Sequence, residues 1–193
     1  MNYVITSYFT PSYAHVADKY LKPSLRELSV PNHISLLSDR GNWQSNTLFK
    51  ANFISRMMIK YPEKGIVFVD ADAVIRAEPV LFDQLFIDGI DFAAHRRTWR
   101  RGRIKDEMLS GTLYFGPTEA ARILVNAWID ENKAHPTKLE QRNLEAAFDA
   151  VSEYPLVWKW LPVEYCTVFD GDDRPKNPVI EHFQASRKMR RKR

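Results

Sequence analysis

The sequence predicts a single α/β domain with a mostly parallel sheet and flanking helices. In the first half of the chain, short apolar segments alternate with longer amphipathic ones, which is typical of strands joined by helices. Such connections place consecutive strands parallel, with helices on both faces of the sheet. The length of 193 residues suits one hydrophobic core. We expect one domain over residues 1–185 and a basic tail over residues 186–193.

Hydrophobic periodicity predicts the elements of the first half. Strands are expected at Tyr3–Phe9, His33–Ser38 and Ile66–Val74. Helices are expected between them at Tyr13–Leu28 and Gln44–Tyr61, and Pro23 should interrupt or kink the first. In the second helix, large apolar side chains recur every four positions, which indicates one buried face.

The second half is less regular, and shorter signals predict its elements. Strands are expected at Asp91–His95, Met108–Gly116 and Val179–Phe183. Helices are expected from Thr118, a suitable N-cap, through Asp130, and over Leu139–Val151. Gly111 inside the second of these strands indicates a bend or a close approach to a ligand.

An Asp-x-Asp pair follows the most apolar of the predicted strands. Ile66–Val69 runs directly into Asp70 and Asp72. Residues two apart in an extended segment point the same way, so both carboxylates should lie on one side of the strand end. The two charges would repel, and one pKa would rise, unless a cation compensated them. A divalent cation such as Mn²⁺ or Mg²⁺, which also binds substrate phosphates, is the simplest partner.

Polar residues also occupy the ends of the two earlier strands, at Thr6–Tyr8 and at Ser38–Arg40. In sheets of this kind, ligands bind at the carboxyl ends of the strands. We therefore expect both segments to join Asp70–Asp72 in one site.

The net charge of +4 conceals two strongly basic segments. The first contains Arg96, Arg97, Arg100, Arg101, Arg103 and Lys105. The second contains Arg187, Lys188, Arg190, Arg191, Lys192 and Arg193. The rest of the chain is acidic, and this concentration of positive charge favours a polyanionic partner. A solvated loop followed by a disordered tail remains the alternative.

Composition excludes some classes of protein. Cys166 is the single cysteine, so no intrachain disulfide can form, and a reducing compartment is expected. No apolar run approaches the length of a membrane span. The N-terminus lacks the features of a signal peptide. These observations predict a soluble, cytoplasmic protein.

The run from Lys50 to Ile75 resembles the core of the GT-A fold nucleotide-sugar glycosyltransferases. In that superfamily, a helix carrying Lys or Arg precedes a strand that ends in a metal-binding Asp-x-Asp. Leu109–Phe115 is similar to the strand that lines the donor sugar and acceptor, and Leu139–Leu144 to an acidic-Gln helix start beside the sugar. Leu161-Pro162 and Val179–Phe183 resemble the closing segments, where a His often completes the metal shell.

This resemblance implies roles for particular residues. The metal ligands would be Asp70, Asp72 and His182, the cation Mn²⁺ or Mg²⁺, and the donor a nucleotide sugar, UDP-linked. The donor would be contacted by Thr6, Ser7, Tyr8, Lys50, Arg56, Asp70, Ser110 and Gly111. Glu140, which stands where the family usually has Asp, or Gln141 would lie near the anomeric carbon or the acceptor hydroxyl.

Structural roles compete with several of these assignments. A lone histidine such as His182 is more often structural than metal-bound. Tyr8 could simply pack at a strand end, and Lys50 and Arg56 could lie on a solvated helix face. Glu140 could stabilise the helix dipole. Asp106 and Glu107 are further possible general bases, and the sequence leaves a retaining or an inverting outcome open.

The acceptor is predicted from the first basic segment, in which Trp99 lies between Arg97 and Arg100. Such an aromatic can stack on a base while its neighbours hold phosphates. The predicted acceptor-binding residues are Arg96, Arg97, Trp99, Arg100, Arg101 and Arg103. They favour hydroxylated bases in DNA, as for phage DNA glycosyltransferases, which would act in the host cytoplasm. Lipopolysaccharide or another envelope glycan is the competing acceptor, and the tail would then contact anionic lipid.

Two other classes of function fit parts of the sequence. Asp70–Val74 matches the nucleophile motif of haloacid-dehalogenase-type phosphohydrolases, and Gly171–Asp173 resembles their distal acidic motif. That motif normally opens the chain, whereas two strand–helix units precede it here. A non-enzymatic nucleic-acid-binding module would explain the arginines, but it gives no reason for Asp-x-Asp at the end of a buried strand.

Overall fold

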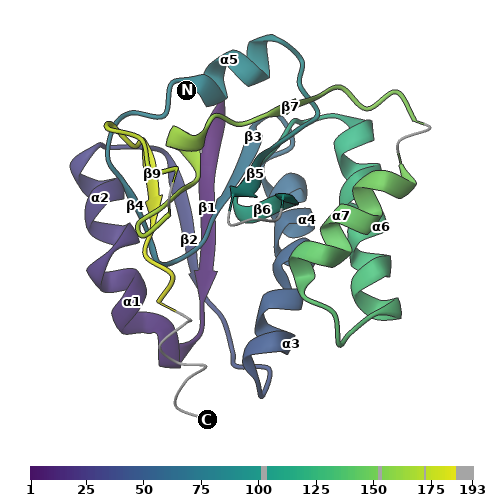
Figure 1. Cartoon of the computed structure of the whole chain (residues 1–193), viewed down its shortest axis with the longest axis horizontal. Coiled ribbons are helices and arrows are strands. Elements are labelled where there is room, and N and C mark those ends of the chain that lie inside the picture. Colours follow the sequence, from purple (N-terminus) through teal and green to yellow (C-terminus); the bar gives the residue numbers. More distant parts are fainter. Residues whose placement is uncertain (101–103, 152–153, 172, 186–193) are drawn as a thin grey trace.

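The computed structural model describes residues 1–100, 104–151, 154–171 and 173–185, and a large sheet organises this part of the chain (Figure 1). Its strand order is β2-β1-β3-β6-β5-β7. The strands are β1 (Tyr3–Phe9), β2 (Asn32–Leu36), β3 (Gly65–Val69), β5 (Phe92–Arg100), β6 (Ile104–Phe115) and β7 (Trp158–Trp160). β6 runs antiparallel to both of its neighbours, and the other pairings are parallel. The prediction of a mostly parallel sheet is therefore confirmed, and the reversal of β6 was not predicted.

Helices cover both faces of this sheet, as predicted. The α-helices are α1 (Ala14–Lys19), α2 (Leu21–Glu27), α3 (Trp43–Leu48), α4 (Lys50–Lys60), α5 (Leu81–Ile87), α6 (Glu119–Ala134) and α7 (Glu140–Ala150). Short 3₁₀ helices form at η1 (Pro11–Tyr13) and η2 (Val163–Tyr165). Within the described ranges, no helix is both long and apolar enough to cross a membrane.

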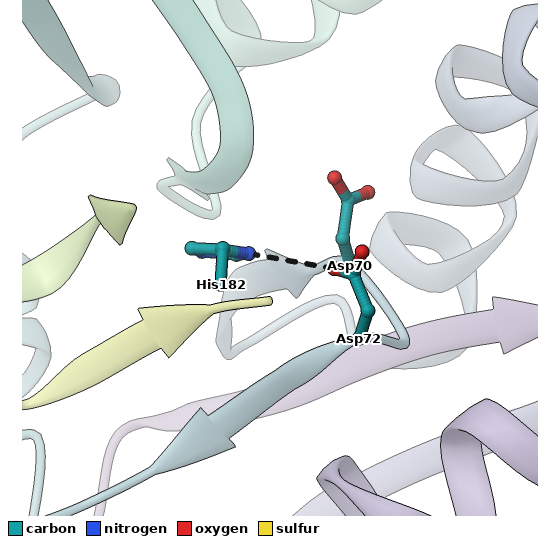
Figure 2. A group of neighbouring side chains, drawn as sticks. All are labelled: Asp70, Asp72 and His182. Atoms are coloured by element: carbon teal, nitrogen blue, oxygen red, sulfur yellow. Dashed lines mark ion pairs between the residues drawn. The ribbon is translucent and has the colours of Figure 1, made fainter. Parts of the chain in front are cut away.

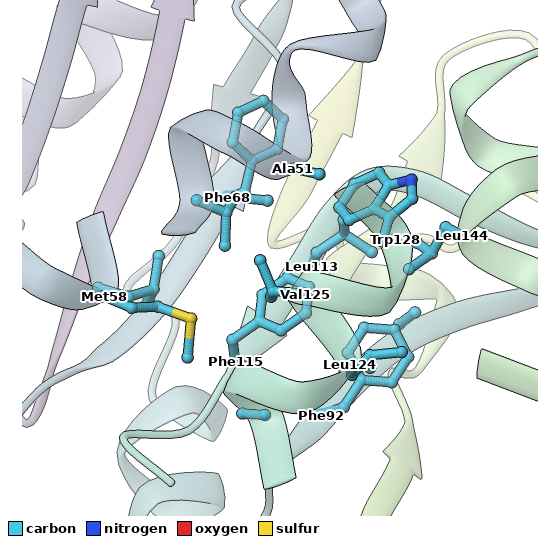
Figure 3. Packing of buried hydrophobic residues seen from close by; sticks show 14 of the residues in the cluster. Ala51, Met58, Phe68, Phe92, Leu113, Phe115, Leu124, Val125, Trp128 and Leu144 are labelled. Carbon is cyan, nitrogen blue, oxygen red and sulfur yellow. The ribbon is translucent and has the colours of Figure 1, made fainter. Parts of the chain in front are cut away.

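The larger hydrophobic core lies between the sheet and the helices α4, α6 and α7 (Figure 3). Trp128 of α6 is fully buried there, close to Leu144 of α7 and Phe115 of β6. A second core covers the other face, where Leu25 of α2 and Phe82 of α5 pack in one cluster with the strands. The sheet is thus buried on both faces, which leaves the ends of its strands as the place for a site.

Two predicted helices are each divided in the structure. The first breaks at Tyr20 rather than at Pro23, and Pro23 lies in the first turn of α2. The amides of a first helical turn have no partner within the helix, so a proline there removes no hydrogen bond. The second breaks at Phe49, between α3 and α4. The helix after Thr118 is confirmed, since the Thr118 side chain accepts a hydrogen bond from the amide of Ala121.

The strand that was predicted to contain the Asp-x-Asp pair ends before it. β3 ends at Val69, and a turn follows in which the amide of Ala73 donates to the carbonyl of Asp70 (3.0 Å). The next strand, β4 (Ala73–Ile75), joins a separate sheet of the described chain with β9 (Ile180–His182) and β8 (Thr167–Val168). The expected alternation of side chains along one strand is therefore wrong, and a turn brings the two aspartates together instead.

An irregularity in β6 brings its middle to the same place. Ala94 of β5 pairs with Leu113, but the next residue, His95, pairs with Leu109. Residues 110–112 therefore have no partner on β5. Thr112 pairs with Val69 at the end of β3, and the carbonyl of Gly111 accepts a hydrogen bond from the amide of the next residue, Asp70 (2.9 Å).

The small sheet carries a buried carboxylate between two arginines. Glu181 is 1% exposed, and it accepts paired hydrogen bonds from the half-exposed Arg76 and Arg174. Burial alone would raise the pKa of Glu181, but the two guanidinium groups outweigh it and lower the pKa. Because the folded-state pKa is lowered, this contribution to stability is present above the ordinary pKa of a glutamate and is lost as the pH falls through the folded-state pKa.

We expect Glu181→Gln to lower the free energy of unfolding by about 2 kcal/mol at pH 7, because charge-assisted hydrogen bonds become neutral ones. The difference from the wild type should shrink as the pH falls below about 4, the ordinary pKa of a glutamate, and it should disappear below the lowered folded-state pKa, where the wild-type carboxylate is protonated in both states. Urea unfolding at several pH values measures this. A deficit of the same size at acid and neutral pH would contradict the ion-pair explanation.

Candidate active site

The three predicted metal ligands lie together at the end of β3 (Figure 2). Asp70 and Asp72 come from the turn between β3 and β4, and His182 comes from β9, where it is the pairing partner of Ala73. One ligand atom from each residue lies within 4.8 Å of the others. The Nδ1 atom of His182 is 3.9 Å from Oδ1 of Asp72. The short sheet thus brings His182 beside a turn that lies more than a hundred residues earlier in the chain.

Gly111 makes room for the imidazole of His182. A Cβ atom at Gly111 would lie 3.0 Å from Cε1 of His182, which is closer than most real contacts. The Nε2 atom of His182 is hydrogen-bonded to Oγ1 of Thr112 (2.8 Å), and its Nδ1 has no hydrogen-bond partner among the described residues. An unpartnered, buried nitrogen beside two carboxylates is a donor set that fits a divalent cation.

The surroundings of His182 favour positive charge. Burial alone would lower its pKa, but Cys166, Asp72 and Asp70 raise it to about 10. In the same way, burial raises the pKa of the Asp70 carboxyl, the Lys50 ammonium opposes this, and the Asp72 carboxylate adds to the rise. The cluster therefore attracts a cation, whether a proton or a metal ion.

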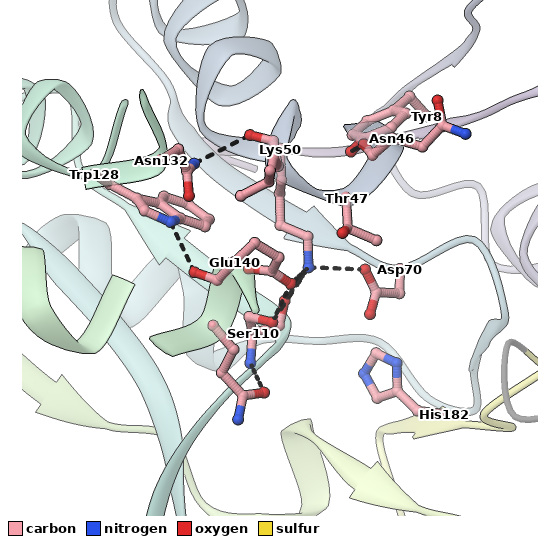
Figure 4. Close-up of polar contacts among 12 residues, drawn as sticks. Tyr8, Asn46, Thr47, Lys50, Asp70, Ser110, Trp128, Asn132, Glu140 and His182 are labelled. Atoms are coloured by element: carbon pink, nitrogen blue, oxygen red, sulfur yellow. Dashed lines mark hydrogen bonds and ion pairs between the residues drawn. The ribbon is translucent and has the colours of Figure 1, made fainter. Parts of the chain in front are cut away.

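Lys50 connects the aspartate cluster to the start of α7 (Figure 4). Its side chain is 4% exposed, and its Nζ lies 3.1 Å from Oδ1 of Asp70 and 2.9 Å from Oε1 of Glu140. It also donates to the carbonyl of Ser110 (2.9 Å). Burial alone would lower the pKa of Lys50, but the two carboxylates raise it, so the ammonium stays charged. The alternative of a solvated helix face is therefore wrong for this residue.

Glu140 begins α7 and is nearly buried, at 7% exposure. Its Oε1 accepts hydrogen bonds from Lys50 and from Oγ of Ser110 (2.7 Å). Its Oε2 has no hydrogen-bond partner in the described part of the chain. The indole of Trp128 donates to the backbone carbonyl of Glu140 (3.0 Å) and thereby fixes the first turn of α7. Glu140 thus keeps one buried carboxylate oxygen without a partner among the described residues, beside the polar contacts of Lys50.

A cavity of about 700 Å³ opens beside these residues. Lys50, Asp70, Asp72 and Glu140 are among the residues that line it. The remaining lining residues are Tyr8, Phe9, Thr10, Ser12, Tyr13, Asp39, Gly41, Asn42, Trp43, Asn46, Thr47, Phe68 and Ala71. A volume of this order is typical of pockets that bind cofactors and other small molecules.

Solved structures with the same architecture exist, although no protein-family model and no curated protein matches the sequence. A glycosyltransferase involved in the glycosylation of the major capsid of PBCV-1 superposes with a TM-score of 0.67 at 13% identity, over 99% of this chain and 97% of that one. The chain has a glycosyltransferase fold.

Two larger glycosyltransferases contain the same fold as part of their length. GlyE of Streptococcus pneumoniae TIGR4 matches 95% of this chain with a TM-score of 0.61 at 15% identity. The bifunctional glycosyltransferase WbbM matches 94% with a TM-score of 0.58 at 12% identity. This chain covers 54% of the first and 45% of the second.

Within this glycosyltransferase fold, the predicted donor residues divide into two groups. Lys50, Asp70 and Tyr8 line the cavity, and Ser110 contacts Lys50 and Glu140. Thr6 and Ser7 do not line it, because both are fully buried inside β1. Their predicted contact with the nucleotide is therefore corrected.

Two further assignments are changed by the surroundings of the residues. The ring of Tyr8 packs against Phe53 (5.0 Å between centroids), and its hydroxyl donates to the carbonyl of Asn46 (2.6 Å). Tyr8 thus packs against the larger hydrophobic core at the edge of the cavity, which agrees with the alternative of strand-end packing. Arg56 is exposed on α4 outside the cavity, with its guanidinium 5.1 Å from the ring centroid of Phe49.

Gln141 lies next to Glu140 but faces the β5–β6 hairpin. Its Nε2 donates to Oε1 of Glu107 (2.8 Å), and its Oε1 accepts from the amide of Ser110 (3.4 Å). Both ends of its amide are therefore engaged, and Gln141 does not line the cavity.

Two of the predicted acceptor residues, Arg96 and Arg97, have described side chains on β5 of this hairpin. Arg96 pairs with Asp106 (2.7 Å) and Arg97 with Glu107 (3.4 Å). For Trp99 and Arg100 the structure describes the backbone but not the side chains. Arg101 and Arg103 lie outside the described residues. The basic tail after residue 185 and Asp172 of the distal acidic motif also lie outside the described residues.

The sequence-based prediction missed much of the cavity wall. Thr10, Ser12 and Tyr13 follow β1, and Asn42, Trp43, Asn46 and Thr47 lie at or in α3. The polar turn after β2 was noted as a strand end, and its Asp39 does line the cavity. Asn42 had a recognisable signal as well, since its side chain caps α3 by accepting from the amide of Ser45 (2.8 Å).

Proposed function

We propose that the protein is a metal-dependent glycosyltransferase, which moves a sugar from a UDP-linked donor to an acceptor hydroxyl. The observation that carries the proposal is the cluster of Asp70, Asp72 and His182 beside a cavity large enough for a nucleotide sugar. The glycosyltransferase fold supports the same reaction class.

In this proposal, Asp70, Asp72 and His182 hold Mn²⁺ or Mg²⁺. When bound, the ion would offset the negative charge that develops on the departing nucleoside diphosphate. Lys50 orients the Asp70 carboxylate through its contact with Oδ1. The charged Lys50 also offsets part of the negative charge of Asp70 and Glu140, which would reduce the repulsion that the donor diphosphate meets in the cavity.

Glu140 is the residue that we assign to the sugar. Its Oε2 is buried and has no hydrogen-bond partner among the described residues, so a sugar or acceptor hydroxyl that reached it would satisfy this oxygen, while Lys50 and Ser110 fix Oε1. The other two possible bases are already engaged within the hairpin. Asp106 accepts from Arg96 and Thr98, and Glu107 accepts from Arg97 and Gln141.

The described residues do not support DNA as the acceptor. Arg96 and Arg97 are neutralised by acidic partners of the same hairpin, so they offer less free positive charge than the sequence indicates. Hydroxymethylated DNA therefore stays one acceptor to test, beside an envelope glycan. Binding to DNA that did not weaken with rising salt would argue against phosphate contacts.

The test is release of UDP from a panel of UDP-sugars, with Mn²⁺ and with or without these acceptors. We expect at least one donor to be cleaved, and EDTA to stop the reaction. The same donor with Mn²⁺ should raise the unfolding temperature, because a ligand that binds the native state stabilises it. Neither cleavage nor a thermal shift with any nucleotide sugar would contradict the proposal. Release of phosphate from phosphomonoesters would favour the phosphohydrolase alternative.

A further inference from the structure

A segment near the end of the described chain, Phe183–Ala185, contacts Asp72 from the other side of the turn. The amide of Phe183 donates to the backbone carbonyl of Asp72 (3.1 Å). The amide of Ala185 donates to the carboxylate oxygen Oδ2 of Asp72 (2.8 Å). The other carboxylate oxygen, Oδ1, is the one that lies 3.9 Å from His182. The two oxygens of Asp72 therefore have different surroundings.

An unusual backbone conformation separates the two amides. Gln184 has a φ of +52°, in the left-handed region that residues other than glycine seldom adopt. β9 ends at His182, and the left-handed residue ends the ladder that pairs it with β4. The next amide consequently meets the side chain of Asp72 instead of another backbone carbonyl.

Aromatic stacking fixes the start of this segment. The ring of Phe183 stacks on Tyr20 (centroids 4.7 Å apart, planes at 18°) and on Phe169 (5.7 Å, 15°). The guanidinium of Arg76 lies 5.7 Å from the Phe183 centroid. Phe183 is thus tied both to the α1–α2 junction and to the residue after β8. The segment is anchored without any ligand, which is what a positioning element requires.

We propose that the backbone amide of Ala185 is a positioning group for metal binding, which holds Oδ2 of Asp72 so that Oδ1 is presented beside His182. The left-handed conformation of Gln184 is the local requirement for this contact. The inference rests on the proposed metal site and adds to it a backbone amide, which contributes without any side chain. Groups that orient a metal ligand commonly matter nearly as much as the ligand.

The test compares two pairs of full-length variants. Ala185→Pro removes the amide hydrogen, whereas Ala185→Gly keeps it. Gln184→Val places a β-branched residue at a positive φ, whereas Gln184→Gly suits that conformation. Mn²⁺ affinity is measured by electron paramagnetic resonance or calorimetry. Ala185→Pro and Gln184→Val should bind Mn²⁺ at least about 10-fold more weakly than the wild type, and the glycine variants within about 2-fold.

A second measurement needs no metal. In the metal-free protein, the Ala185 amide should exchange its hydrogen slowly, and Asp72→Ala should accelerate that exchange. Fast exchange of the Ala185 amide in the wild type would overturn the proposal. So would a folded Ala185→Pro variant that binds Mn²⁺ as tightly as the wild type. An Ala185→Gly variant whose Mn²⁺ affinity falls as far as that of Ala185→Pro would overturn it as well. If the wild type itself bound no Mn²⁺, the metal site would fail together with the role of Ala185. Equal binding by wild type and Ala185→Pro would remove the role of Ala185 alone.

Discussion

Replacing Asp72 with asparagine is expected to lower Mn²⁺-dependent cleavage of the sugar donor by at least about 100-fold, the scale of losing one charge-stabilising group in an active site. The substitution keeps the size of the side chain and removes its charge. Asp72 is 7% exposed, and its carboxylate lies between His182 and the Ala185 amide, so the substitution changes the charge at the centre of the cluster. Rates of UDP release and Mn²⁺ affinity should fall together.

Asp18→Asn is the matched control, because Asp18 is exposed and pairs with Lys22 on the surface. It should leave both donor cleavage and Mn²⁺ affinity unchanged. Circular dichroism checks that the Asp72→Asn protein is folded. Persistent turnover by a folded Asp72→Asn protein would reject the metal assignment.

Replacing Lys50 with methionine is expected to lower the free energy of unfolding by about 3–5 kcal/mol, which is typical when a buried ion pair loses one partner. Methionine fills similar space, but Glu140 then keeps a nearly buried charge with no cation beside it. Asp70 loses its partner as well. Urea denaturation at neutral pH measures the loss. Donor cleavage should also fall, because Asp70 and Glu140 are no longer oriented.

A double-mutant cycle separates the ion pair from packing. Glu140→Gln keeps the acceptor for Lys50 and Ser110 but removes the charge. The double variant Lys50→Met/Glu140→Gln should recover part of the stability lost in Lys50→Met, since the unpaired charge is gone. Lys22→Met, at an exposed pair, should change the stability by less than about 1 kcal/mol. Strictly additive effects at Lys50 and Glu140 would contradict a coupling between them.

The sequence carried much of the fold because the first three strands and their helices have clear apolar periods. The small sheet was not predicted. β4 and β8 are too short to show a period, and the pairing of β4 with β9 joins segments about a hundred residues apart. The antiparallel direction of β6 was not predicted either, because the hydrophobic period of a strand does not indicate the direction in which it pairs. α5 was not predicted, because it is only seven residues long and its apolar side chains show no distinct helical period.

For the site, the sequence predicted which acidic and histidine side chains cluster better than it predicted the residues around them. Asp70, Asp72 and His182 were expected together, and they lie together. The reason given for their proximity was nevertheless wrong, because a turn, and not the alternation of side chains along a strand, places the two aspartates. The bounds of the first strand were predicted correctly, but the polar Thr6 and Ser7 were taken as an exposed strand end, whereas both side chains are buried within β1. The charge of Arg96 and Arg97 was overestimated because Asp106 and Glu107 pair with them only when the hairpin forms.

The pairing of β4 with β9 has a consequence for how the protein matures. A nascent chain that has not yet added β9 already contains Asp70 and Asp72, but it lacks His182 and both amides that bind Asp72. If this cluster holds a metal ion as proposed, the ion can be captured only late in the synthesis of the chain. In that proposal, an incomplete chain has the acidic turn but lacks His182 and the amides that position Asp72, so it would neither bind metal tightly nor cleave donor.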